Sequence, residues 1–196
     1  ATILLASCGH GDPSVNDIHS FGSPETVRTT HGDIHWDLDF EAQQIRGKVT
    51  WTVERAPGAA GSSQLVLDTK DLVIEGVSVG NEDGLRVTTY THGGGSDVLG
   101  IPLTVPIGAE DDRVEIRYRT GDGGACVQWL RPEQTADKTH PFMFSQAQSI
   151  NARSMIPCQD SPGVRFTFDA TVTTPSGIRP VMAAEIIEER GAGGAW

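Results

Sequence analysis

The residues with the most scope for chemistry lie in one short stretch, Phe142-Met143-Phe144-Ser145-Gln146-Ala147-Gln148-Ser149-Ile150-Asn151-Ala152-Arg153. Polar amides and an arginine stand there among aromatic and aliphatic residues, so Gln146 and Gln148 are expected to be partly buried. A buried amide without a hydrogen-bond partner costs about 1–3 kcal/mol. The two glutamines should therefore either brace a turn through hydrogen bonds or face a ligand, and local evidence alone favours the turn.

The histidines and carboxylates give no metal or catalytic motif. His31 and His35 are four residues apart on a strand-like segment, about 13 Å at about 3.3 Å per residue, which is too far for one ion. The remaining histidines are isolated in the sequence. Asp68, Asp71 and Glu75 lack the spacing of a calcium loop, so a solvated turn is favoured. No His-Glu-x-x-His and no Cys-x-x-Cys occurs, and nothing in the chain could perform catalysis unaided.

Length and composition restrict the class of protein. The 196 residues suffice for one large or two small domains with a buried core. Glycine is abundant, with 23 residues, and aromatic residues make up only 6%, which suits strands and turns better than helices. A net charge of −11 argues against a nucleic-acid partner, because binding phosphates requires clustered Lys and Arg.

The elements that must position this stretch have the two-residue period of half-buried strands. Segments 34–40 and 45–53 predict a hairpin, with Gly47 as a bulge or a site of close approach. Further strands are expected at 64–67, 72–79, 86–91, 98–105, 113–119, 164–172 and 179–185. One helical turn is expected within 148–155. Short strands separated by turns predict an all-β fold, either a β-sandwich or a curved sheet.

The first residues look like the end of a processed signal. Leu5-Ala6-Ser7-Cys8 follows a short apolar run and resembles a bacterial lipobox, with Cys8 as the lipidated residue, although no positively charged region precedes it. Residues 1–26 are then a signal remnant and linker, and the protein is expected to be an extracytoplasmic lipoprotein with a lipid anchor at Cys8. The alternative is a cytoplasmic protein with an accidental apolar start. The last residues, 191–196, look like a hairpin turn cut before its second strand.

If Cys8 carries a lipid, two cysteines remain. Cys126 and Cys158 could form a disulfide or stay as free thiols, and spacing alone does not decide between these states.

Long contiguous words in the chain carry a family resemblance. They are Gln-Trp-Leu-Arg-Pro-Glu-Gln-Thr at 128–135, His-Pro-Phe-Met-Phe-Ser-Gln-Ala-Gln at 140–148, Ile-Pro-Cys-Gln-Asp-Ser-Pro at 156–162 and Leu-Val-Leu-Asp-Thr-Lys-Asp-Leu at 65–72. The stretch 126–163 resembles the N-terminal domain of the leukotriene-A(4) hydrolase-like zinc aminopeptidases, within the aminopeptidase N superfamily. A weaker likeness extends from about residue 27 to the end of the chain.

The resemblance implies a saddle-shaped, curved mixed sheet over residues 27–196 that packs on a thermolysin-like catalytic domain. In the family that domain carries the zinc ion, a His-Glu-x-x-His motif and a Gly-x-Met-Glu-Asn strand. This chain has neither motif. It is therefore expected to be the N-terminal part of a zinc aminopeptidase, to bind no zinc itself, and to have its own catalytic domain as partner.

The resemblance also implies a substrate site. Gln148 matches the residue that helps hold the free α-amino group of a peptide substrate, where most of the superfamily has Glu. An amide oxygen can orient an ammonium at about 2.9 Å. Gln146 would line the same cleft or brace Gln148, and Ser149 falls at a small S1-pocket residue. Ser149 and Ala147 depart from the hydrolase pattern, so peptidase activity is favoured over epoxide hydrolysis.

Two other functions compete with this interpretation. One is a non-catalytic β-sandwich that binds peptides or a protein surface. The other is a carbohydrate-binding sandwich with Trp36, Trp51 and Trp129 as the sugar platform, although Trp36 and Trp51 alternate as core residues.

Overall fold

The computed structural model describes residues 17–59 and 64–188. Within these ranges the regular structure is strands and two short 3-10 helices, η1 (Pro132–Gln134) and η2 (Ala152–Ser154). The second lies within the expected helical turn. None of the helices in this part of the chain is long and apolar enough to cross a membrane. Cys8 and the lipobox-like segment lie outside the described residues.

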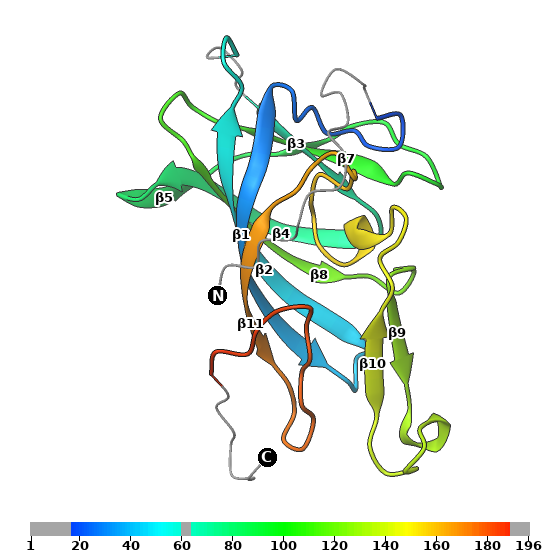
Figure 1. Cartoon of the computed structure of the whole chain (residues 1–196). Helices are drawn as coiled ribbons and strands as arrows, with labels where there is room; N and C mark the ends of the chain where they lie inside the picture. Colours follow the sequence, from blue (N-terminus) through cyan, green and yellow to red (C-terminus); the bar gives the residue numbers. More distant parts are fainter. Residues whose placement is uncertain (1–16, 60–63, 189–196) are drawn as a thin grey trace.

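The largest sheet has six strands in the order β11-β1-β2-β8-β4-β5 (Figure 1). Their bounds are β1 (Val27–Asp39), β2 (Gln44–Arg55), β4 (Leu72–Asn81), β5 (Gly84–Val87), β8 (Arg113–Thr120) and β11 (Thr167–Thr173). β11 runs parallel to β1, whereas every other neighbouring pair is antiparallel. The expected all-β fold with a mixed sheet is therefore confirmed.

β1 and β2 form the expected hairpin, and Gly47 marks a close approach within it. Trp36 pairs with Gly47 in the ladder, and its indole N–H donates a hydrogen bond of 2.8 Å to the Tyr118 hydroxyl of β8. A Cβ atom at position 47 would overlap the Tyr118 ring. Glycine is required there because the ring occupies the space of a side chain.

A second sheet closes the core. It contains β3 (Gln64–Thr69), β7 (Ile101–Pro106) and β6 (Thr91–His92), in the order β3-β7-β6. Its buried Leu65, Leu67 and Leu103 pack in one cluster with Trp51 and Ile116 of the large sheet. The alternating apolar residues of both sheets thus face each other, which gives the sandwich-like packing that the sequence period predicts.

Two expected strands differ in the structure. Segment 86–91 is interrupted: β5 ends at Val87 in the large sheet, and β6 begins at Thr91 in the small one, so the chain changes sheets between them. Segment 179–185 forms no strand within the described residues. Val181 is 79% exposed, whereas Met182 is partly buried against the core, so this segment contacts the core without pairing to a strand of the described sheets.

Candidate functional site

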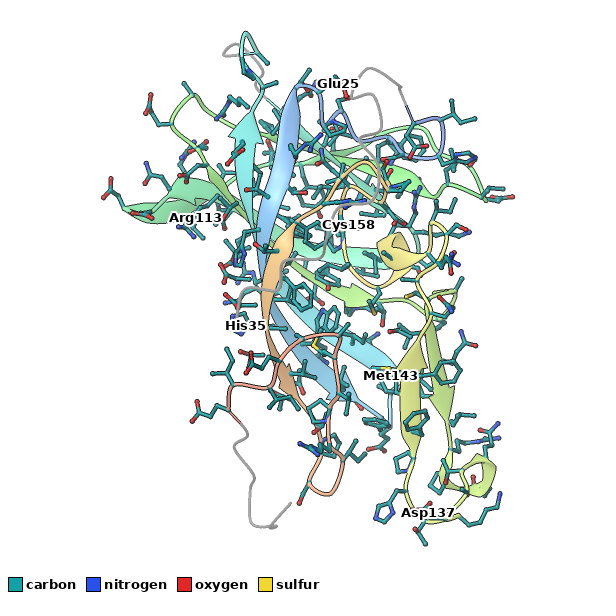
Figure 2. All side chains as sticks on the ribbon, viewed as in Figure 1. Glu25, His35, Arg113, Asp137, Met143 and Cys158 are labelled. Atoms are coloured by element: carbon teal, nitrogen blue, oxygen red, sulfur yellow. The ribbon has the colours of Figure 1, made fainter. Side chains whose placement is uncertain are left out.

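The candidate site begins at a hairpin that projects from the two sheets. β9 (Val127–Leu130) and β10 (Phe142–Ser145) form a separate antiparallel pair, with Met143 opposite Trp129. Figure 2 shows Met143 on this hairpin and Asp137 at its far end. These strands are not predicted from the sequence, because each has only four residues and Pro132 breaks the pattern between them. Their only signal was the alternation of Val127 and Trp129 with polar Gln128.

The far end of the hairpin is fixed by its own hydrogen bonds. The Asp137 carboxylate accepts from the backbone N–H groups of Thr139 at 3.0 Å and His140 at 3.2 Å. It also lies 2.6 Å from His140 Nδ1. These hydrogen bonds, chiefly the one to the His140 side chain, hold the pKa of the Asp137 carboxyl well below its usual range.

Residues 146–151, called the amide segment below, follow β10 directly. Gln146 N–H donates to the Cys126 carbonyl at 2.7 Å, which continues the β9–β10 pairing by one residue. The Gln146 side-chain oxygen accepts from the Gln148 N–H at 3.0 Å, and Asn151 N–H closes a turn onto the Ala147 carbonyl at 2.9 Å. Gln146 is thus positioned to brace Gln148, one of the two arrangements that the sequence left open.

The expectation of partial burial is wrong for both glutamines. Gln146, Gln148 and Ser149 are exposed, because the neighbouring aromatic residues that suggested burial, Phe142 and Phe144, are themselves 54% and 43% exposed. Among the described residues, the side-chain amide of Gln148 makes no hydrogen bond. Its donor and acceptor atoms are therefore free to meet another molecule or domain.

A buried arginine anchors the chain just behind this segment. The Arg153 guanidinium donates to the Asp160 carboxylate at 3.0 Å and to the carbonyls of Leu99 at 2.9 Å and His19 at 2.6 Å. Its side chain is 0% exposed. All three guanidinium nitrogens thus donate to acceptors within the fold, as a fully buried cation requires.

Asp68 completes this buried cluster. Its carboxylate accepts from Ser20 Oγ at 2.6 Å, from Phe21 N–H at 2.7 Å and from Asp160 N–H at 2.8 Å, and it lies 3.7 Å from Arg153 Nη1. The expectation that Asp68 belongs to a solvated turn is therefore wrong, because the chain segments before β1 and after η2 fold over it. Asp68, Arg153 and Asp160 are called the buried ionic cluster below.

Ser154 joins the buried ionic cluster to the amide segment. Its hydroxyl donates to the Asn151 carbonyl at 2.8 Å and accepts from the Cys126 N–H at 3.0 Å. Since Cys126 in turn accepts from Gln146, the backbone of the segment is held at both ends. The exposed side chains of Gln148 and Ser149 thus stand on a fixed backbone.

The two described cysteines are free thiols. Cys126 and Cys158 are both buried and unpaired with each other. Burial raises the pKa of the Cys126 thiol to about 11, so this thiol stays protonated near neutral pH. The question that the spacing left open is decided in favour of free thiols.

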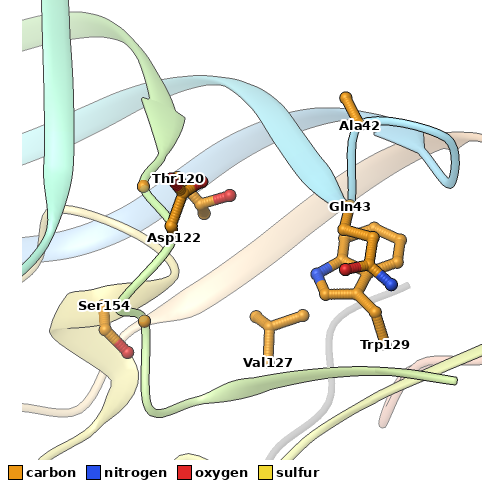
Figure 3. A pocket seen from close by; sticks show the side chains of 9 residues that line it. Ala42, Gln43, Thr120, Asp122, Val127, Trp129 and Ser154 are labelled. Carbon is orange, nitrogen blue, oxygen red and sulfur yellow. The ribbon is translucent and has the colours of Figure 1, made fainter.

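Two hollows lie beside the hairpin, between β9 and the β1–β2 turn, and Figure 3 shows the smaller of them. Both are lined by Gln43 and Trp129, and their volumes are about 190 Å³ and about 480 Å³. Neither is lined by Gln146, Gln148 or Ser149. The three residues predicted to bind substrate therefore stand on open surface in this part of the protein rather than in an enclosed cavity.

A tryptophan sugar platform is excluded. Trp51 is 0% and Trp36 is 9% exposed, both in the core. Trp129 is half-buried and packs edge-on against Phe40, with ring centroids 5.1 Å apart. The three rings thus share no exposed face.

The described residues do not form the zinc site that the family resemblance assigns to a catalytic domain. They contain one group of His, Cys, Asp or Glu side chains able to share a metal ion, His31, Asp33 and Asp169. These residues lie on β1 and β11, and the group has one imidazole rather than the two of His-Glu-x-x-His. None of them belongs to the hairpin or to the amide segment.

Comparison with known proteins agrees with this geometry. The sequence-family model of the peptidase M1 N-terminal domain matches residues 28–190. The leukotriene A-4 hydrolase of Xenopus laevis is 37% identical over 170 residues, and leucine aminopeptidase 2 of Neurospora crassa is 38% identical over 165 residues. The solved structure of native yeast LTA4 hydrolase superposes with a TM-score of 0.75 at 27% identity.

The chain therefore belongs to the peptidase M1 N-terminal domain family. The match covers 86%, 82% and 83% of this chain, but only 27%, 24% and 25% of the Xenopus, Neurospora and yeast proteins. The chain thus spans about a quarter of the length of these relatives, and it corresponds to their N-terminal part.

Proposed function

We propose that the chain is the substrate-positioning N-terminal domain of a zinc-dependent aminopeptidase that removes N-terminal residues from peptides. The observation that carries the proposal is the Gln148 side chain: it is exposed and makes no hydrogen bond among the described residues, yet its backbone is fixed by Gln146 and Asn151. Membership of the peptidase M1 N-terminal domain family and the similarity to leucine aminopeptidase 2 support the same reaction class.

Gln148 would hold the free amino end of the substrate. An ammonium carries three donors and no acceptor, so the amide oxygen of Gln148 can accept one of them at about 2.9 Å. Fixing that end sets which peptide bond reaches the reacting centre, and hence the removal of terminal residues. The Gln146 side chain restrains the backbone of Gln148, and Ser149 would line the pocket for the first residue.

The zinc ion would be bound by a catalytic domain, since the described residues of this chain do not form its site. The exposed hairpin and amide segment would face that domain, and residues from both sides would complete the substrate site. Peptides are favoured as substrates over lipid epoxides, which would be at most a side activity, because Ala147 and Ser149 depart from the hydrolase pattern.

The test is the substitution Gln148→Ala in the intact enzyme. For peptides with free N-termini we expect kcat/KM to fall by an amount equivalent to about 2–4 kcal/mol of transition-state binding, the scale of an oriented polar contact. Gln128→Ala is the matched control, because Gln128 is an exposed amide on β9 whose side chain, among the described residues, bonds only to the nearby Ala125 carbonyl. An unchanged kcat/KM for Gln148→Ala would remove this residue from the site.

A second candidate is a non-catalytic module that binds a peptide or protein surface. Phe142 and Phe144 favour it, since they stack with centroids 6.1 Å apart and are both substantially exposed. The coding sequence distinguishes the two candidates. An open reading frame that lacks His-Glu-x-x-His downstream of residue 196 would support the binding module and contradict the aminopeptidase.

A further inference from the structure

Two carboxylates face each other across the parallel pair of β1 and β11. Asp33 is directly opposite Asp169 in the register, and His31 is directly opposite Thr167. Residues two apart on a strand share a face, so all four side chains belong to one face of the sheet. Like charges placed directly opposite each other are unfavourable unless a cation lies between them.

His31 occupies the position between the two carboxylates. Its Nε2 atom is 3.5 Å from Asp33 Oδ1 and 3.6 Å from Asp169 Oδ2. Both distances exceed the usual N–H···O range of about 2.7–3.2 Å. When ligand atoms surround one ion tetrahedrally, with metal–ligand distances of about 2.0–2.1 Å, they lie about 3.3 Å from one another. The two distances from His31 are close to this spacing. The imidazole nitrogen therefore lies at the spacing of a co-ligand from both carboxylates, and the three ligand atoms all lie within 4.8 Å of one another.

The other ring nitrogen of His31 is held by a neighbour. Nδ1 lies 2.7 Å from Thr167 Oγ1. Metal-bound histidines nearly always use their second nitrogen in such a hydrogen bond, which fixes the ring and leaves the first nitrogen to the metal. Thr167 comes from β11 and His31 from β1, so the strand pairing that opposes the carboxylates also orients the imidazole.

We propose that His31, Asp33 and Asp169 form a binding site for one divalent transition-metal ion of the zinc type. One imidazole nitrogen with two carboxylate oxygens suits zinc, cobalt or nickel better than magnesium or calcium, which prefer oxygen ligands throughout. The side chains are 30%, 41% and 59% exposed, so water can fill the remaining coordination positions. No residue outside this chain is needed.

Such an ion would attach an edge strand to the sheet. β11 is the outermost strand and most of its residues are exposed. It contributes little to the buried core, so a cross-link between β1 and β11 is expected to raise stability when the metal is bound. Ligands that bind only the folded state stabilise it in proportion to their affinity.

The experiment is metal titration of the purified, metal-free 196-residue chain. Because this chain has no His-Glu-x-x-His motif, a catalytic zinc site does not add to the number of ions bound. Zinc and cobalt are titrated by calorimetry, and thermal unfolding is followed by circular dichroism with and without zinc. The test variants are Asp169→Asn, Thr167→Val and the double variant His31→Ala/Asp33→Asn. The control is His35→Ala/Asp37→Asn, which makes the same chemical changes on the same face of β1.

We expect one ion per chain, and a zinc-dependent rise in the unfolding temperature for the wild type and the control. Thr167→Val should weaken binding about 10- to 100-fold, and Asp169→Asn should weaken it by at least as much. The single Asp169 change alters an exposed side chain, so it tests the site even if the double variant does not fold. Equal affinity in the wild type and Asp169→Asn, or no binding by the folded wild type, would overturn the proposal.

Discussion

The buried ionic cluster and the amide segment are neighbours in sequence but differ in how their polar groups are satisfied. Arg153 has partners on several chain segments and is fully buried. Gln148, five residues earlier, is exposed and has an unbonded amide among the described residues. Both residues belong to the stretch that carries the family resemblance. One motif therefore contains a residue that is paired inside the fold and a residue whose side chain is left exposed.

The difference separates residues that hold the fold from residues that face outward. A buried charge is tolerated only with full pairing, so Arg153 and Asp68 serve the internal structure. An exposed amide on a fixed backbone gains nothing internally, which leaves it available to a substrate or another domain. The following changes test whether this division is real, beginning with the largest expected effect.

The first change is Arg153→Met, which removes the charge and keeps a side chain of similar length. Asp160 and Asp68 would lose their buried cation, and the carbonyls of Leu99 and His19 would lose their donor. We expect the free energy of unfolding to fall by about 3–5 kcal/mol. Urea unfolding followed by circular dichroism measures it.

Arg46→Met is the control for this change, because Arg46 pairs with Asp39 at 3.4 Å on the surface. Exposed pairs contribute about 1 kcal/mol or less. If Arg153→Met cost no more than Arg46→Met, the cluster would not be the anchor that the contacts indicate.

The second change concerns acid stability at the rim of the cluster. The Asp17 carboxylate accepts from Ser161 Oγ at 2.6 Å and from His19 N–H at 2.9 Å. These hydrogen bonds, first that of Ser161, hold the pKa of Asp17 below its usual value. Because its pKa is lower folded than unfolded, Asp17 stabilises the fold above the unfolded pKa of about 3.9, and this contribution is lost as pH falls through the folded pKa.

We therefore expect Asp17→Asn to reduce the loss of stability between pH about 6 and about 3, by less than about 1 kcal/mol after solvent screening. Urea midpoints at the two pH values measure the difference. Glu41→Gln, at an exposed residue of the β1–β2 turn, controls for the change in net charge. An acid profile of Asp17→Asn identical to that of the wild type would show that these hydrogen bonds do not bear on folding.

The smallest effect on stability is expected for Gln148→Ala. Its side chain makes no internal hydrogen bond among the described residues, so the free energy of unfolding should change by no more than about 0.5 kcal/mol. The same unfolding experiment measures it. A loss of more than about 1 kcal/mol, above the usual range for such surface sites, would mean that Gln148 supports the fold, and the contrast with Arg153 would disappear.

Much of the fold could be predicted from the sequence because its signal is local. The alternation along β1 and β2 gave the hairpin, and Gly47 marked a close approach, since both reflect which residues face the core. The segment at 179–185 has a similar period but pairs with no strand among the described residues, and alternation alone cannot supply a partner. The β9–β10 hairpin was missed because its strands are too short to show a period.

The candidate site was predictable only in part. The family resemblance selected Gln146, Gln148 and Ser149 by position, whereas their exposure depended on how Phe142 and Phe144 are packed. Asp68 was misjudged as solvated, because the residues that bury it come from distant parts of the chain. Neighbours far apart in sequence decide burial, and no local pattern records them.

The sequence by itself determined the all-β class, the principal hairpin and, through contiguous matched words, the family. Those properties rest on side-chain period and on residue identity along the chain. Only the tertiary structure decided which polar groups are paired and which are free: it brought Asp68 to Arg153, and Asp169 to His31. The physical reason is that charges and hydrogen bonds act over a few ångströms in space, and folding alone brings residues so distant in sequence within that range.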